Sequence, residues 1–374
     1  MSLDSILETA GRVADDVALP HAAAVDRDGA FPEAALDALR AAGLLGLVSA
    51  ADVGGLGHGT RAAAFVVERL ARACASTAMV TCMHYAGAFV LERFADEGTR
   101  RDLAAGRHLS TLAFSEAGSR SHFWAPTSTA RAEGDEVVLD AQKSWITSAH
   151  RASAYVWSSR PIAGEGLSTL WLVPQDSRGL RVPARYDGLG LRGNDSTPVR
   201  ADGVRLPASR RLGPDGGGFD VMMGVVLPNF AVMNAACSLG VMEAAITGAA
   251  AHCGGTRHEH LDSRLADLPT IRAYVARMKV RADACRTLWL DTLDALETGR
   301  ADAMLRVLET KAACGEAALE VTATAMRVCG GAAYRKELGV ERAFRDAQAA
   351  SVMAPTTDQL YDFIGKAVCG LPLF

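Results

Sequence analysis

Residues 112–147 read LAFSEAGSRSHFWAPTSTARAEGDEVVLDAQKSWIT, a polar turn followed by two alternating runs. The turn, residues 115–121, is rich in serine and glycine, and the runs VVLD and KSWIT alternate as antiparallel β-strands do. Such a turn offers backbone N–H groups and hydroxyls, which suit the phosphates or the polar ring edge of a nucleotide cofactor. The stretch therefore predicts a β domain with a turn that can bind such a ligand.

Trp145 and Thr147 are two residues apart in the second run, so the sequence predicts that their side chains share one face of the strand. A large flat aromatic beside a hydroxyl fits a planar heterocycle such as flavin. Ser/Gly turns before hairpins are also common in proteins without such a ligand, and this pattern alone leaves both interpretations open.

The same segment resembles the acyl-CoA dehydrogenase family, whose middle domain carries F-[ST]-E-x-x-x-G-S-D followed by G-x-K-x-[WY]-I-T-N. Residues 114–116 read FSE and residues 142–148 read QKSWITS, which match this pattern closely. Arg120 and His122 replace the usual Gly and Asp. In that family the segment lies along the flavin of FAD, so the resemblance implies that this chain binds FAD.

Composition narrows the class of protein. A chain of 374 residues with 49% hydrophobic residues can bury a large core in two or three domains, and a formal net charge of -4 gives no case for nucleic acid or an anionic membrane. The eight cysteines form no CxxC pair and the nine histidines no HExxH motif, so we expect reduced, mostly buried thiols and no metal site. With no signal peptide and no continuous apolar run of roughly 18 residues, we expect a cytoplasmic protein.

Three regions follow one another along the chain. Residues 1–108 are Ala/Leu-rich with helical spacing, and they predict an N-terminal all-α domain. Residues 109–215 turn to short alternating runs separated by Gly, Pro and Asp, which predict an antiparallel, barrel-like β domain. Residues 216–374 return to long Ala-rich helices that predict a C-terminal four-helix bundle, with Pro228 at the start or a kink of one helix. The predicted fold class is α+β.

The resemblance to acyl-CoA dehydrogenases extends over essentially the whole chain. Residues 188–197 read GLGLRGNDST, residues 204–207 read VRLP and residues 212–219 read LGPDGGGF, in the order of the family's G-x-R-x-S-x-T, VP and G-x-G-x-G-F signature. The three predicted domains also follow the family's order. Family members are usually tetramers or dimers with FAD reaching across a subunit boundary, so the resemblance implies a homotetramer or homodimer.

The reaction implied by the resemblance removes a proton next to a thioester carbonyl and a hydride from the next carbon, and it uses a carboxylate base. In the family this glutamate commonly lies in Y-E-G-T after R-D-A, and that position is Ala354 here, after residues 345–347. Other members place the base on a helix of the C-terminal domain, at the position of Phe230. Pro228 and Ala231 replace residues that often help to hold the CoA arm.

Three side chains are candidates for a replacement catalytic group. Glu243 lies on the same predicted helix as Phe230, and Asp358 lies four residues beyond Ala354. His84 lies in an N-terminal helix, in a stretch where related flavin enzymes use polar groups. Each has a structural alternative, because Glu243 fits a solvated or interface charge, Asp358 fits a helix N-terminus, and His84 fits a packed, hydrogen-bonded histidine.

Different chemistry on the same scaffold is a second interpretation, because loss of a general base costs about 10²- to 10⁴-fold in rate. A flavin-dependent monooxygenase uses reduced flavin and O2, and it needs no base beside a carbonyl. A third interpretation is a catalytically silent family member kept for assembly or binding.

The expected function is FAD-dependent α,β-dehydrogenation of an acyl thioester, bound to CoA or to a carrier protein. An electron-transfer flavoprotein or a flavin reductase is the expected partner, and neither nucleic acid nor membrane is expected. The residues that the resemblance places near the adenosine of FAD depart from the family pattern, which leaves FMN as an alternative cofactor. The resemblance also implies that Arg257 reaches the FAD of a neighbouring subunit. By position, the resemblance implies that the cofactor contacts are Phe114, Ser115, Ser121, Trp145, Thr147, Arg257, Arg327, Gly331, Thr356 and Asp358.

Overall fold

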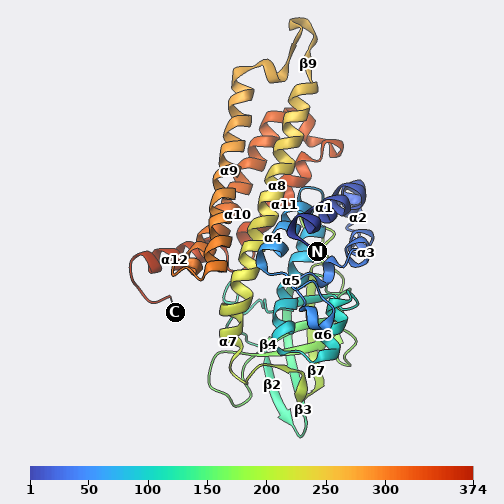
Figure 1. Cartoon of the computed structure of the whole chain (residues 1–374), viewed down its shortest axis with the longest axis vertical. Helices are drawn as coiled ribbons and strands as arrows, with labels where there is room; N and C mark the ends of the chain where they lie inside the picture. The colour runs from blue at the N-terminus through green and yellow to red at the C-terminus, as the bar shows by residue number, and fades with distance from the viewer. Residues whose placement is uncertain (374) are drawn as a thin grey trace.

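The computed structural model describes residues 1–373 and shows a layer of small sheets beneath a tall helical bundle, with the N-terminal helices packed at their side (Figure 1). The N-terminal part is helical, as predicted. A single π-helical turn, Val13–Ala18, joins its first two helices. The α-helices are α1 (Leu3–Arg12), α2 (Leu19–Asp28), α3 (Glu33–Ala41), α4 (Thr60–Ala71), α5 (Ala75–Phe94) and α6 (Glu97–Ala104).

The middle part forms two four-stranded sheets, in the orders β1-β4-β5-β8 and β2-β3-β7-β6. Buried apolar side chains of both sheets, with Trp157 and Trp171 the largest, share one core. The β1–β4 pairing is parallel, which differs from the predicted antiparallel arrangement at this one place. The strands are β1 (Ser110–Ala113), β2 (Thr129–Glu133), β3 (Glu136–Ile146), β4 (Ala154–Ser159), β5 (Thr169–Pro174), β6 (Leu180–Arg181), β7 (Thr197–Pro207) and β8 (Arg211–Leu212).

The runs VVLD and KSWIT, except for the final Thr147, belong to one long strand, β3, rather than to two strands. Both runs face the same neighbour, β7, so the chain has no reason to turn between them. Register shifts in the β3–β7 ladder, one of them between Lys143 and Ile146, interrupt the strict alternation that the sequence predicted. Such irregularities re-aim side chains, and this one lies at Trp145.

The C-terminal part contains the predicted bundle, in which α8 (Leu227–Gly255), α9 (Pro269–Thr298), α10 (Ala303–Cys329) and α11 (Val340–Val352) pack on one another. Short α7 (Gly218–Val221) and a π-helical turn, Met222–Val226, run into α8. Pro228 lies in the first turn of α8, where its missing N–H is tolerated. The short strands β9 (Arg257–His258) and β10 (Ser263–Arg264) cap the top of the bundle, and α12 (Thr357–Val368) projects from its side (Figure 1).

The segment Gly218–Gly255 is long and apolar enough to cross a membrane, but 94% of its most apolar window is buried inside the protein. The central helix α8 contacts α4, α9, α10 and α11, which explains why apolar residues surround it on all sides. The apolar composition of α8 is therefore that of a core helix.

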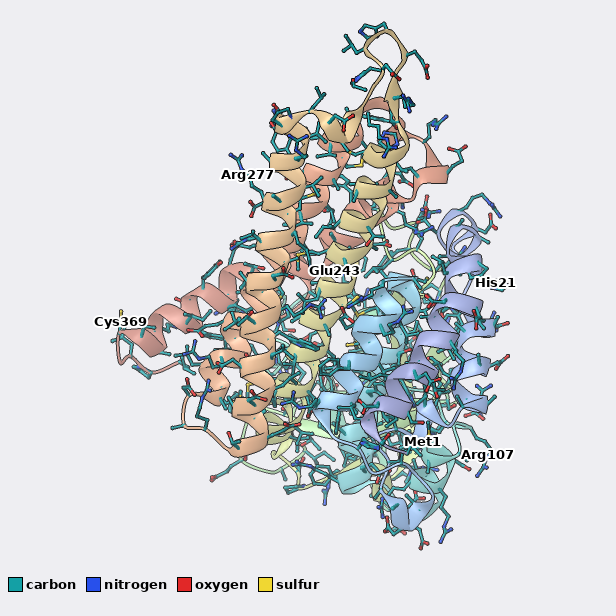
Figure 2. The ribbon with its side chains drawn as sticks, turned by 45° about the horizontal axis from the view of Figure 1, so that its top comes forward. Met1, His21, Arg107, Glu243, Arg277 and Cys369 are labelled. Carbon is teal, nitrogen blue, oxygen red and sulfur yellow. The ribbon has the colours of Figure 1, made fainter. Side chains whose placement is uncertain are left out.

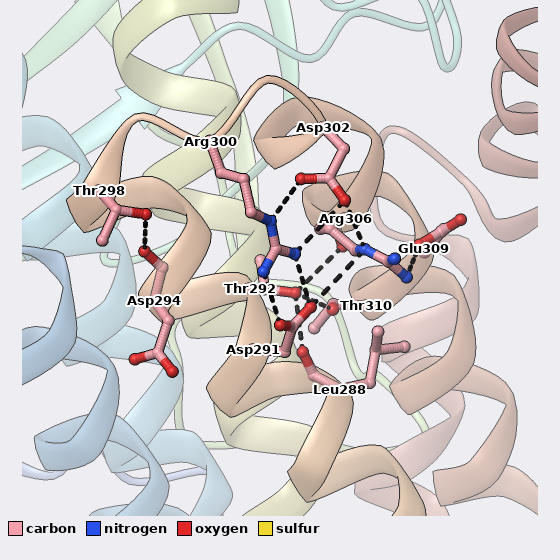
Figure 3. Close-up of polar contacts among 10 residues, drawn as sticks. All are labelled: Leu288, Asp291, Thr292, Asp294, Thr298, Arg300, Asp302, Arg306, Glu309 and Thr310. Atoms are coloured by element: carbon pink, nitrogen blue, oxygen red, sulfur yellow. Dashed lines mark hydrogen bonds and ion pairs between the residues drawn. The ribbon is translucent and has the colours of Figure 1, made fainter.

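Polar contacts close the α9–α10 hairpin (Figure 3). Gly299 ends α9 in the left-handed conformation with a φ of 65°. Arg300 then binds Asp291 and Asp302 at 2.7 and 2.5 Å. Beneath these half-exposed ion pairs, the buried hydroxyls of Thr292 and Thr310 lie 2.6 Å apart. The hairpin therefore fixes where α10 begins relative to α9.

Candidate active site

A cavity of about 890 Å³ lies where the β domain meets α5, the start of α8 and the segment between α11 and α12. Its volume is within the range of ligand pockets in proteins. Six of the predicted cofactor residues line it, although they come from segments more than 200 residues apart. These residues are Phe114, Ser115, Ser121, Trp145, Thr147 and Thr356.

Trp145 presents a large aromatic face to this cavity. Its side chain is 63% exposed in a domain whose other tryptophans are buried, and its φ is +58°. The ring of Tyr186 lies 4.4 Å from that of Trp145, centroid to centroid. Trp145 and Thr147 both line the cavity as predicted, but the strand irregularity, rather than simple alternation, places them there.

A buried ion pair holds the serine-rich turn against β3. The ammonium Nζ of Lys143 lies 2.5 Å from Glu116 Oε1, and both side chains are almost completely buried. Lys143 also donates to the carbonyl and the hydroxyl of Ser158, and Glu116 accepts from the backbone N–H of Thr127 at 2.6 Å. These contacts fix the position of the turn that lines the cavity.

The two partners of this pair respond differently to burial. Burial lowers the pKa of Lys143 to about 8 against the opposing effect of Glu116. For Glu116, burial alone would raise the pKa, but the charge of Lys143 and the hydrogen bonds to Glu116 outweigh it and lower the pKa. Glu116 is therefore a paired carboxylate that accepts no further proton near neutral pH.

The turn also reaches the C-terminal part of the chain. The backbone N–H of Thr356 donates to Ser121 Oγ at 3.1 Å, and the Thr356 side chain caps the N-terminus of α12. One hydrogen bond therefore connects the two walls of the cavity, one from the β domain and one from the bundle.

Part of the cavity lining is apolar. Met79 and Met83 from α5, Phe230 from α8 and Ala354 from the segment before α12 belong to this part. Phe230 and Ala354, the two positions that the resemblance implies for the base, thus line the cavity, and neither carries a carboxylate. Among the lining residues in the described part of the chain, Glu116 is the only carboxylate, and Lys143 neutralises it.

None of the three catalytic candidates lines this cavity. Glu243 lies about 20 Å beyond Phe230 along α8, by the rise of an α-helix, and it binds Lys279 at 3.2 Å and Arg286 at 3.6 Å. Figure 2 shows Glu243 midway along α8. Asp358 is exposed in the first turn of α12.

His84 is completely buried beneath β1. Its Nδ1 accepts from the backbone N–H of Ser110 at 3.1 Å, and its Nε2 lies 2.9 Å from the carbonyl oxygen of Leu45. Burial lowers the pKa of His84 to about 4, so the imidazole is neutral at physiological pH. In this position His84 joins α5 to β1, and it does not face the cavity.

The predicted adenosine-side residues lie far from this cavity. Arg257 belongs to β9 at the top of the bundle, opposite the sheets in Figure 1, and it pairs with Asp262. The guanidinium of Arg327 stacks over Tyr274 at 4.8 Å near the end of α10, and Gly331 follows in the next turn. A role for these residues at the FAD of another subunit stays a prediction.

Several lining residues were missed from the sequence. Tyr186, Arg185 and Arg120 face the cavity from exposed loops, and no periodicity marked them. Asn194 and Ser196 belong to the motif at residues 188–197, so the sequence already pointed to the segment that contains them. Arg120 and Arg185 add two basic side chains to the cavity lining.

Three family models cover most of the chain. The models for the N-terminal, middle and C-terminal domains of acyl-CoA dehydrogenases match residues 2–105, 111–204 and 216–369. The chain belongs to the acyl-CoA dehydrogenase family. Proteins of this family are FAD-dependent oxidoreductases that act on acyl thioesters.

Relatives and solved structures agree with this family. The chain is 29% identical to the mitochondrial short-chain specific acyl-CoA dehydrogenase of Homo sapiens, over 94% of this chain and 86% of the relative. A glutaryl-coenzyme A dehydrogenase in complex with glutaryl-CoA superposes with a TM-score of 0.93 at 24% identity, covering 100% and 97% of the two chains. The prolyl acyl carrier protein oxidase AnaB superposes with a TM-score of 0.90 at 18% identity, covering 98% of each chain. The two structures show the shared fold.

Proposed function

We propose that this acyl-CoA dehydrogenase family member oxidises the α,β-bond of an acyl thioester in the 890 Å³ cavity, and that the α-proton leaves to water rather than to a carboxylate of the wall. The observation that carries the proposal is the meeting of the serine-rich turn, Trp145 and Thr356 around one cavity with an apolar far wall. A flat cofactor and an acyl chain need these two kinds of surface side by side.

The residues present fit FAD. The exposed ring of Trp145 offers stacking area, Thr147 offers a hydroxyl on the same wall, and the turn at Ser121 offers backbone N–H groups. FAD, when bound, supplies the hydride acceptor. The chain's own residues would hold the cofactor and orient the thioester.

The acyl chain would lie against the apolar wall made by Met79, Met83 and Phe230. Ala354 leaves room there that a glutamate would occupy. With Glu116 engaged by Lys143, no lining carboxylate of the described chain is available to take the α-proton. Water is the remaining proton acceptor in this proposal, since the described lining offers no unpaired carboxylate.

A carrier protein is the proposed source of the thioester. Ala231 and Pro228, at positions that often help to hold the CoA arm, are both buried and offer no charge. The structural similarity to a protein described as an acyl carrier protein oxidase supports this choice. Arg120 and Arg185, two basic side chains of the cavity lining, suit the phosphate of a pantetheine arm.

A flavin-dependent monooxygenase is the second candidate, and the lack of an unpaired carboxylate in the described lining favours it, since that chemistry needs no base beside a carbonyl. An anaerobic titration separates the two. The FAD-loaded protein is mixed with matched acyl-CoA and acyl-carrier-protein thioesters while the flavin absorbance is followed.

Bleaching by a thioester without O2 supports dehydrogenation, and faster bleaching by the carrier-bound form supports the proposed delivery. Equal rates for the two forms contradict delivery by a carrier protein. If no thioester bleaches the flavin, but added NAD(P)H and a flavin reductase give O2-dependent turnover, dehydrogenation is wrong and the monooxygenase replaces it.

A further inference from the structure

Lys311, on α10, has an unusual environment for a lysine. Its side chain is buried, with the residue only 1% exposed. Its Nζ donates to the carbonyl oxygen of Met353 at 3.0 Å and to that of Pro355 at 2.8 Å. No ion pair to Lys311 is formed within residues 1–373, so backbone carbonyls alone offset the buried charge.

The two carbonyl groups that Lys311 binds flank Ala354. Met353 and Ala354 line the cavity, as does Thr356 one residue after Pro355. Lys311 therefore binds the residues on both sides of Ala354, the position that the resemblance implies for the base. Lys311 itself does not line the cavity.

A second buried polar side chain supports the same segment. Asn234, on α8, donates from Nδ2 to the sulfur of Met353 at 3.2 Å and is 1% exposed. The segment before α12 is thus held from α8 through a side chain and from α10 through the backbone. Because the segment has no regular secondary structure of its own, these contacts define its path.

The position of Lys311 is itself fixed. The preceding residue, Thr310, forms the buried hydroxyl contact with Thr292 of α9 (Figure 3). An amino group that is held rigidly in a low-dielectric interior orients the carbonyl groups that accept its hydrogen bonds. Burial without a carboxylate partner also lowers the pKa of Lys311 to about 7.

We propose that Lys311 is a positioning residue of the active site: by binding the carbonyl groups on both sides of Ala354, it sets the part of the cavity wall that residues 353–356 form. The inference rests on the proposed use of the cavity for FAD and a thioester. Lys311 touches neither ligand directly, since it lies behind the wall. Its loss would act through the segment 353–356.

The test compares Lys311→Met, which removes both hydrogen bonds, with Thr322→Val. Thr322 is a matched control because it is buried on the same helix and bonds only within α10, to the carbonyl groups of Ala318 and Leu319. Lys311→Gln keeps a buried donor and serves as the conservative variant. FAD affinity is measured by titrating the flavin-free protein, and the KM and kcat of the loaded enzyme are measured separately.

We expect Lys311→Met to weaken FAD binding about tenfold, the effect of losing one buried hydrogen-bonded anchor. We expect Lys311→Gln to recover part of this loss and Thr322→Val to bind FAD like the wild type. In the loaded enzyme, KM for the substrate should rise more than kcat falls, because the wall is displaced while the chemistry is unchanged.

FAD binding by Lys311→Met at the wild-type affinity would overturn the inference, as would an equal loss in Thr322→Val. If Lys311→Met does not fold, the comparison of Lys311→Gln with Thr322→Val decides in the same way. Because FAD affinity requires no turnover, a shift in affinity without oxidation of any thioester would support Lys311 while contradicting the proposed function.

Discussion

Replacing Ala354 by glutamate should turn the apolar wall into one that carries a general base. Ala354 lies in the cavity wall, between the two residues whose carbonyl groups Lys311 binds. A glutamate there points into a cavity of about 890 Å³ rather than into packed core, so the side chain can be accommodated. A positioned general base contributes about 10²- to 10⁴-fold in rate.

The surroundings favour a useful pKa for this glutamate. Phe230 and Met353 make the wall apolar, and desolvation raises the pKa of a carboxyl group toward the range where it acts as a base near neutral pH. We therefore expect Ala354→Glu to accelerate anaerobic flavin bleaching by a thioester about 10²-fold or more. The same variant should speed the exchange of the α-proton with D2O.

Ala354→Gln is the matched control, because it has nearly the same volume and no charge. It should bleach no faster than the wild type. Equal rates for Ala354→Glu and Ala354→Gln would refute the argument, since they would show either that a base already acts in the cavity or that the α-carbon lies elsewhere.

Three further substitutions test the site and its support. Trp145→Ala should weaken FAD binding about tenfold in a fluorescence titration, because it removes the exposed stacking surface, whereas Trp145→Phe should retain most of the affinity; equal affinity in all three proteins would show that the flavin does not use this wall. Lys143→Met should lower the free energy of unfolding by about 3–5 kcal/mol in chemical denaturation, because Glu116 is left buried and unpaired. Adding Glu116→Gln should restore much of the lost stability. A double variant as unstable as Lys143→Met would contradict the pairing of Lys143 with Glu116 as the source of this stability. Asp346 is buried, which raises its pKa from 3.8 to about 6, so between these pH values the folded state binds a proton that the unfolded state has released, and stability falls as pH rises. The free energy of unfolding of Asp346→Asn, measured by chemical denaturation, should therefore rise relative to that of the wild type between pH 4 and 7, by on the order of 2–3 kcal/mol. If the difference in free energy between the two proteins does not vary with pH, the raised pKa of Asp346 is wrong.

The local sequence pattern was sufficient to predict the helices and much of the β domain. The Ala-rich periodicity predicted long helices in residues 216–374, and α8, α9 and α10 are such helices, because burial of apolar side chains at helical spacing is a local signal. The parallel β1–β4 pairing carried no such signal. It depends on which strand a distant segment meets.

The candidate site shows the same division. Motif positions such as Ser121, Trp145 and Thr356 could be predicted to share a ligand, and they meet in one cavity. The contacts that hold these positions could not be predicted from the sequence. Lys311, for example, binds residues that are 42 and 44 positions further along the chain. Glu243 satisfied the sequence criterion of lying on the right helix, but helix rise carries it about 20 Å past the cavity.

The most direct test of the central claim is a crystal structure of the protein with FAD and a non-reactive thioester analogue. We expect the flavin ring to lie against Trp145 and Thr147 and the acyl chain to lie beside Phe230 and Ala354. We expect no protein carboxylate near the α-carbon. A flavin bound away from Trp145, or an acidic side chain in contact with the α-carbon, would contradict it.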